Sequence, residues 1–188
     1  MEEKGNVKQI WAKADKQSIA FYGMLIGAVL MIAALFLPFG TAAGEYTEYL
    51  NRYPKRYLVE EMEMTNAEGI HISLIKFFRI YYTVAQLGVS REIGIACMVI
   101  ISLFAFFAIL TAICSVRKKP VPAIIFDILS FAVLQIVRWD FQDRGVIPSS
   151  RYDWGIASYI AYIGIVIVFA GAVMMLAKKK KQKKQQNI

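Results

Sequence analysis

The stretch IGIACMVIISLFAFFAILTAICS, from Ile93 to Ser115, contains no charged residue over its whole length. Its apolar residues form one uninterrupted block, instead of recurring at the period of an amphipathic helix or strand. A helix of about twenty such residues covers the ~30 Å hydrocarbon core of a bilayer. The stretch therefore predicts a membrane-spanning helix.

Three further apolar blocks lie at residues 19–39, 121–137 and 154–177, and 57% of the 188 residues are hydrophobic, which is too apolar for an ordinary soluble domain. We therefore predict an all-α integral membrane protein with four transmembrane helices. The predicted organisation is a cytoplasmic N-terminal segment (1–18), a first span (19–39), an extracytoplasmic loop region (40–91), a second span (92–115), a cytoplasmic turn (116–120), a third span (121–137), an extracytoplasmic loop (138–153), a fourth span (154–177) and a basic cytoplasmic tail (178–188).

The positions of the lysines and arginines predict the orientation. The short turn with Arg117, Lys118 and Lys119 and the tail over Lys178–Lys184 lie on the same side of a four-span protein. Cytoplasmic segments carry the excess of Lys and Arg, so both termini are expected in the cytoplasm, with the protein in the inner or plasma membrane. The net charge of +8 is explained by these signals, and nucleic acid is not an expected partner.

The extracytoplasmic loop region is expected to contain a small β-hairpin. The segments LVEEMEM (58–64) and IHISL (70–74) have the composition of short strands. Between them, TNAEG (65–69) supplies Asn66 and Gly69, which favour a turn.

An amphipathic helix is predicted after the hairpin, over SLIKFFRIYYTVAQLG (73–88). Lys76 and Arg79 argue against a fifth span, since each central cation costs about 2.5–3.5 kcal/mol on insertion. The helix is expected to lie on the outer leaflet or on the bundle. The residues predicted for its apolar face are Leu74, Ile75, Phe78, Tyr81, Tyr82 and Ala85.

Asp127 places a carboxyl group inside the predicted third span, which is costly unless it faces the bundle. Thr111 lies at a similar depth in the second span, and Gln135 is the other strongly polar residue deep in the third. We expect these three residues to form an intramembrane polar site. A structural carboxyl hydrogen-bonded between helices is favoured, and a protonatable group on a transport path is the alternative.

Glycines in two spans predict close helix packing. Gly23 and Gly27 form a GxxxG pattern in the first span, while Gly164 and Gly171 lie in the fourth with alanines nearby. Small residues at such spacing let two helix backbones approach closely, within the bundle or in a dimer.

Signals for catalysis, metal or cofactor binding are missing from the sequence. It contains no GxSxG, HExxH or Walker motif, so we predict a protein without enzymatic activity.

Cys97 and Cys114 lie on one predicted helix about 25 Å apart and cannot form a disulfide with each other. The acidic cluster near the only histidine is better explained as a solvated surface than as a metal site; it comprises Glu60, Glu61, Glu63, Glu68 and His71.

The favoured function is binding of a partner by the 40–91 region, as an accessory subunit, a sensor or an immunity-type protein. The chain devotes about fifty residues to this region and few polar groups to the spans. Besides the lipid bilayer, the expected partner is a membrane protein or another copy of the chain. The alternative is a small oligomeric transporter or channel that uses Asp127. The residues predicted for the partner-binding surface are Tyr53, Tyr57, Phe78, Tyr81 and Tyr82.

Overall fold

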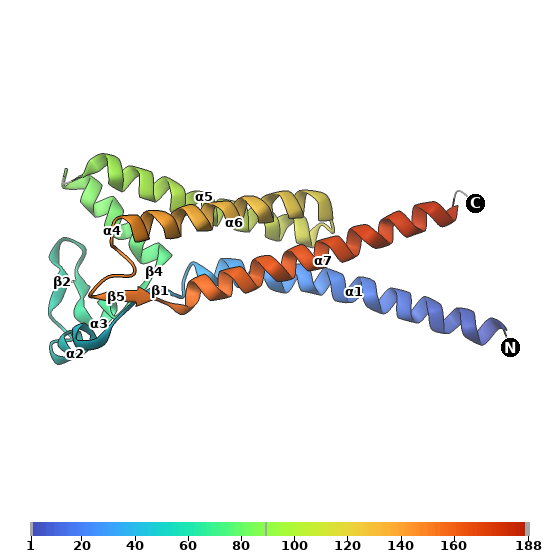
Figure 1. Ribbon diagram of the computed structural model, residues 1–188, viewed down its shortest axis with the longest axis horizontal. Coiled ribbons are helices and arrows are strands. Elements are labelled where there is room, and N and C mark those ends of the chain that lie inside the picture. Colours follow the sequence, from blue (N-terminus) through green and yellow to red (C-terminus); the bar gives the residue numbers. More distant parts are fainter. Residues whose placement is uncertain (1, 89, 187–188) are drawn as a thin grey trace.

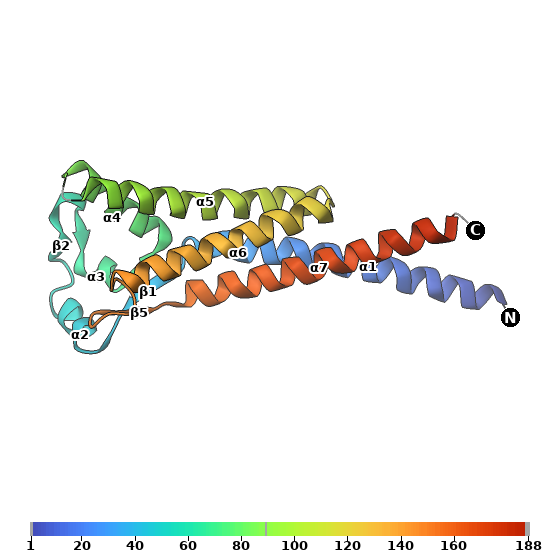
Figure 2. The ribbon, with the colours of Figure 1, turned by 45° about the horizontal axis from the view of Figure 1, so that its top comes forward.

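In the described part of the chain, four long helices form a bundle that we call the stem (Figure 1). The computed structural model describes residues 2–88 and 90–186, with side chains described over 18–88 and 90–178. Both ends of the chain lie at the same end of the stem, and the turn between α5 and α6 points towards that end (Figures 1 and 2). The stem helices are α1 (Glu2–Ala34), α5 (Arg91–Val116), α6 (Pro120–Asp143) and α7 (Ile156–Gln186).

Among the described residues, three of these helices are long and apolar enough to cross a membrane: α5, α6 and the part of α7 over Ile156–Lys178. Large apolar side chains also cover the outside of the stem. Val99, Phe106 and Val166, for example, are 51%, 54% and 66% exposed. A helix that is apolar on its inner and outer faces is suited to hydrocarbon, so the stem indicates a membrane-embedded protein.

The apolar part of α1 is shorter than the first predicted span. It covers Ser18–Ala34, and the helix ends at Ala34 instead of residue 39. Phe39 lies in the strand β1 (Pro38–Ala42), so the predicted boundary is wrong. Pro38 has no N–H and disfavours helical backbone in the residue before it, which explains why the helix cannot continue through this point. At its other end α1 begins at Glu2, within the predicted N-terminal segment.

The remaining elements form a compact unit at the end of the stem opposite the termini (Figures 1 and 2). We call residues 38–86 and 144–154 the head. The strand β1 is the centre of an antiparallel sheet, between β4 (His71–Ser73) and β5 (Tyr152–Trp154). The other head elements are α2 (Gly44–Arg52), β2 (Tyr57–Val59), the 3-10 helix η1 (Glu60–Met62), β3 (Met64–Thr65), α3 (Asn66–Gly69) and α4 (Leu74–Gln86).

The predicted hairpin between residues 58–64 and 70–74 is wrong. The strand β2 pairs instead with β3, while β4 pairs with β1. The expected turn forms the short helix α3, because Thr65 and Glu68 make a capping box. Within it the Thr65 backbone N–H donates to the Glu68 carboxylate at 3.0 Å. This local capping turns the chain away from β3, so that the following strand reaches β1.

The helix α6 is longer than the third predicted span, which ended at residue 137. It continues to Asp143, and the predicted loop at 138–153 therefore begins only at Arg144. The charged residues Arg138 and Asp140 lie within this helix, and both have polar partners on neighbouring side chains.

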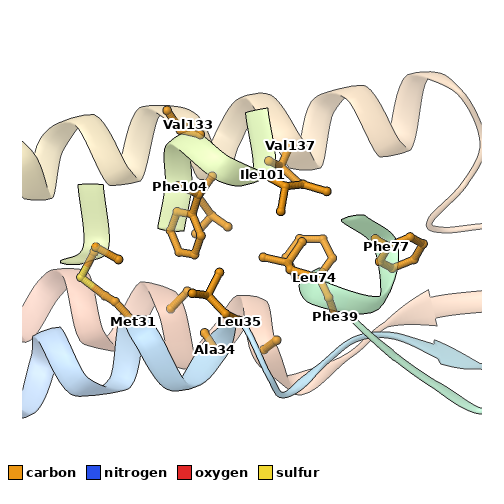
Figure 3. Close-up of a cluster of buried hydrophobic side chains, with 14 of the residues drawn as sticks. Met31, Ala34, Leu35, Phe39, Leu74, Phe77, Ile101, Phe104, Val133 and Val137 are labelled. Carbon is orange, nitrogen blue, oxygen red and sulfur yellow. The ribbon is translucent and has the colours of Figure 1, made fainter. Parts of the chain in front are cut away.

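The larger hydrophobic core of the described residues contains side chains of both the head and the stem. Figure 3 shows Phe39, Leu74 and Phe77 of the head close to Ile101 and Val137 of the stem. All five side chains are at least 95% buried. The head is therefore packed directly against the stem helices and shares their core.

Candidate functional site

Asp127 is buried in the stem with both carboxyl oxygens unpartnered within the described part of the chain. The Thr111 hydroxyl on α5 is also buried and has no hydrogen-bond partner there. Nearby serines do not supply one: Ser115 and Ser130 donate to carbonyls of their own helices, at 2.8 and 2.9 Å. The hydrogen bond expected between Asp127 and a neighbouring helix is therefore absent among the described residues.

Gln135 does not join Asp127 and Thr111. Its side chain is exposed and accepts a hydrogen bond from the Tyr162 hydroxyl at 3.1 Å. That hydroxyl in turn accepts from Arg138 Nη1 at 3.1 Å, and the Arg138 guanidinium lies 4.4 Å from the centre of the Trp154 ring. These residues join α6 to α7 near the head. The predicted three-residue polar site is thus divided: Gln135 is exposed whereas Asp127 is buried, and eight residues of helix separate them by about 12 Å along the axis of α6.

A polar cluster that sequence reasoning missed lies where the head meets α5 and α6. Arg144 forms an ion pair with Asp140, and its Nε donates to the same carboxylate at 3.0 Å. Its Nη2 also donates to the Tyr81 hydroxyl at 3.0 Å and to the Cys97 sulfur at 3.2 Å. The Cys97 thiol lies 3.7 Å from Asp140 Oδ2. The i, i+4 spacing of Asp140 and Arg144 was a visible signal for the ion pair, but the other two partners come from distant parts of the chain.

Burial makes Tyr81 a neutral member of this cluster. It raises the pKa of the Tyr81 hydroxyl to about 12, although the adjacent Arg144 opposes the shift. The hydroxyl therefore stays protonated at physiological pH and accepts the hydrogen bond from Arg144 without carrying charge. The chemistry of this cluster is that of a structural clamp between α4, α5 and α6.

The predicted packing glycines differ in how closely a neighbour approaches. A Cβ on Gly27 of α1 would lie 2.5 Å from the Gly164 carbonyl oxygen of α7, and one on Gly164 would lie 2.7 Å from the Gly27 oxygen. A Cβ on Gly171 would lie 2.8 Å from the Ala20 oxygen. At Gly23 the nearest atom would be 4.0 Å away. The close α1–α7 approach thus involves three of the four glycines.

The structure separates the five residues of the predicted partner-binding surface. Tyr53, Tyr57 and Tyr82 are 49%, 54% and 52% exposed. Phe78 is half-buried, and Tyr81 is only 8% exposed because its side of α4 packs on α5. Tyr81 therefore cannot contact a partner. The predicted apolar face of α4 is confirmed in part: Leu74 and Tyr81 are buried, whereas Ile75 and Tyr82 are exposed, and the third buried residue is Phe77.

No group of three or more His, Cys, Asp or Glu side chains that could hold a metal ion occurs among the described residues. No protein-family model matches the chain, and neither the curated proteins nor the solved structures include a match. Inferences about function therefore depend on the geometry of this chain.

Proposed function

We propose that this chain is a multi-pass membrane protein without enzymatic activity that binds a protein partner through its head, as an accessory subunit, a sensor or an immunity-type protein. The observation that carries the proposal is the combination of a firmly packed head with exposed tyrosines. Tyrosines on a rigid scaffold give a large contact area at a low cost in conformational entropy, and they are common in binding surfaces.

In the proposed topology, α1 also crosses the membrane, the head lies outside the cytoplasm and both termini lie inside it. Two features support this arrangement. The α5–α6 turn points towards the end of the stem at which the termini lie, away from the head (Figure 1). The lysine-rich tail and the turn containing Arg117, Lys118 and Lys119 are therefore both directed away from the head, as the distribution of cations in membrane proteins favours.

Photo-crosslinking in native membranes tests the proposal. A benzophenone amino acid replaces Tyr53, Tyr57 or Tyr82 in the head, and Tyr159 of the stem serves as the matched control because its exposure is similar, at 57%. We expect one defined protein adduct from the head positions and none from Tyr159. Adducts to lipid alone from every position would contradict a partner-binding head.

The buried carboxyl group favours a second candidate function, a small oligomeric transporter or channel that works through Asp127. An unpartnered acid in the core of a helix bundle is costly for folding and is found where protons or ions are handled. Under this alternative, Asp127→Asn abolishes ion or substrate flux in proteoliposomes and leaves assembly intact. If the variant changes only the melting temperature, the transport function is excluded.

A further inference from the structure

Residues 51–57, with the sequence NRYPKRY, form a segment at the far end of the head that we call the tip; all seven are exposed. Arg52, Lys55 and Arg56 give it three cations, and none of them forms an ion pair among the described residues. Glu48 lies one helical turn before Arg52 but does not pair with it. The tip therefore presents positive charge that the rest of the described head does not neutralise by direct contact.

Hydrogen bonds from Asn66 and Ala67 of α3 fix the backbone of the tip. The Asn66 side chain donates to the Tyr53 carbonyl at 2.9 Å, and the Asn66 backbone N–H donates to the Arg56 carbonyl at 2.8 Å. The Ala67 N–H donates to the Pro54 carbonyl at 3.1 Å. Asn66 is only 2% exposed, so a buried polar side chain is devoted to fixing this segment. Because these bonds use the tip's carbonyl groups, its side chains remain directed outward on a preorganised backbone.

Tyrosines extend the tip into an aromatic strip. Tyr53 and Tyr57 are about half exposed, and the ring centre of Tyr53 lies 6.0 Å from that of Tyr49. The Tyr49 ring is stacked with Tyr46 at 6.2 Å. Tyrosine and arginine together are the residues that most often dominate the energy of protein interfaces.

We propose that the tip binds an acidic segment of the partner protein. The cations would pair with Asp or Glu carboxylates of that segment, for which the planar guanidinium of arginine is the best donor, while the tyrosines would pack against its apolar atoms. This inference rests on the proposed function and names the chemistry of the partner. Bilayer headgroups are a poor fit, because α2 and β2, which flank the tip, lie at the end of the molecule away from the termini (Figures 1 and 2).

Binding of a defined acidic polymer tests the charge preference. The full chain is placed in nanodiscs of phosphatidylcholine and titrated with fluorescent poly-L-glutamate. The triple variant Arg52→Gln/Lys55→Gln/Arg56→Gln is compared with Lys179→Gln/Lys180→Gln/Lys181→Gln, which removes the same charge from the C-terminal end. We expect the tip variant to lose affinity about tenfold and the tail variant to change it less than about twofold.

The tyrosines have a separate readout. Tyr53→Ala/Tyr57→Ala should weaken binding of poly-L-glutamate at low and at high salt alike, because packing is not screened by salt as charge pairing is.

An equal loss of affinity in the tip and tail variants would mean attraction by net charge alone and would overturn the proposal. Tighter binding of heparin or polyphosphate through the same cations would also overturn it, in favour of another polyanion. So would a change from dimer to monomer in the tip variant, since the occupant would then be a second copy.

Failure of this inference is distinct from failure of the proposed function. If a protein adduct forms from Tyr53 in native membranes and its yield is unchanged in the triple tip variant, the head binds a partner but not through acidic residues. If poly-L-glutamate binds as expected and no adduct forms in membranes, the tip has the predicted chemistry and the proposed function is wrong.

Discussion

Arg144 connects three elements of the fold through one guanidinium group. Its partners are Asp140 on α6, Cys97 on α5 and Tyr81 on α4, and the side chains of the ion pair are only about a quarter exposed. When one member of a largely buried ion pair is removed, the remaining charge has no partner. The loss of folding free energy is then larger than the net contribution of the pair to stability.

Replacing Arg144 should therefore destabilise the protein measurably. We expect Arg144→Ala to lower the free energy of unfolding by about 2–3 kcal/mol, because Asp140 is left unpaired. Thermal unfolding in detergent measures the effect, with Arg79→Ala as control, since Arg79 is exposed and should change stability by less than about 0.5 kcal/mol. The double variant Arg144→Ala/Asp140→Ala should recover part of the loss; a double variant no better than the single one would exclude this explanation.

At the scale of elements, the packing of α1 against α7 depends on the glycines at which the two helix backbones approach most closely. Gly27→Ala should lower the free energy of unfolding by about 1–3 kcal/mol, because its Cβ would meet the Gly164 carbonyl oxygen and the helices would have to separate. Gly23→Ala is the matched control on the same helix and has room for the methyl group. Unfolding of both variants, followed by circular dichroism in detergent, should separate them. Equal stability of the two variants would contradict the close packing of α1 against α7.

The short helix α3, which supports the tip, should respond to acid. Hydrogen bonding from the Thr65 backbone N–H lowers the pKa of Glu68, so the carboxylate stabilises the folded helix when it is ionised. A lowered folded-state pKa means that this stability is present above the ordinary pKa of Glu68 and is lost as the pH falls through the lowered value. Hydrogen exchange of the residue 66–69 amides should accelerate relative to other head amides on acidification. In Glu68→Gln the pH dependence should disappear; if it persists, another group is responsible.

At the scale of the whole molecule, the proposed topology predicts which positions a membrane-impermeant reagent can reach. In a Cys114→Ser background, with native Cys97 only 2% exposed, a cysteine is placed at Lys55 of the tip or at Lys118 of the α5–α6 turn. We expect a charged maleimide to label Lys55→Cys on intact cells and Lys118→Cys only after permeabilisation. Labelling of both positions from the same side would contradict a stem that crosses the bilayer between them.

The sequence predicted the stem far better than the head. Long apolar runs such as Ile93–Ser115 determine helices by their own composition, and α5 lies where that run predicted it. Pro38 is a local signal for the end of α1, but the strand that follows was missed because it exists only through pairing with β4 and β5. The predicted hairpin failed for the same reason, since β1, the strand with which β4 pairs, lies far from it in the chain.

Two features of the candidate sites were also decided by packing. Tyr81 was expected on the surface, but the helix α4 turns it towards Arg144. Asp127 was expected to have a hydrogen-bond partner, and none is present among the described residues. A one-dimensional pattern shows that a carboxyl group lies in an apolar helix, but it does not show which side chains surround it.

By itself, the sequence determined the membrane character of this protein, because hydropathy and length are properties of contiguous residues and need no tertiary contact. Only the tertiary structure decided that the head is clamped to the stem through Arg144 and that the tip is held outward by the buried Asn66. Arg144 contacts side chains 63 and 47 residues away, and Asn66 contacts a carbonyl group 13 residues away. The free energy of such contacts arises from shape and burial that no local pattern records.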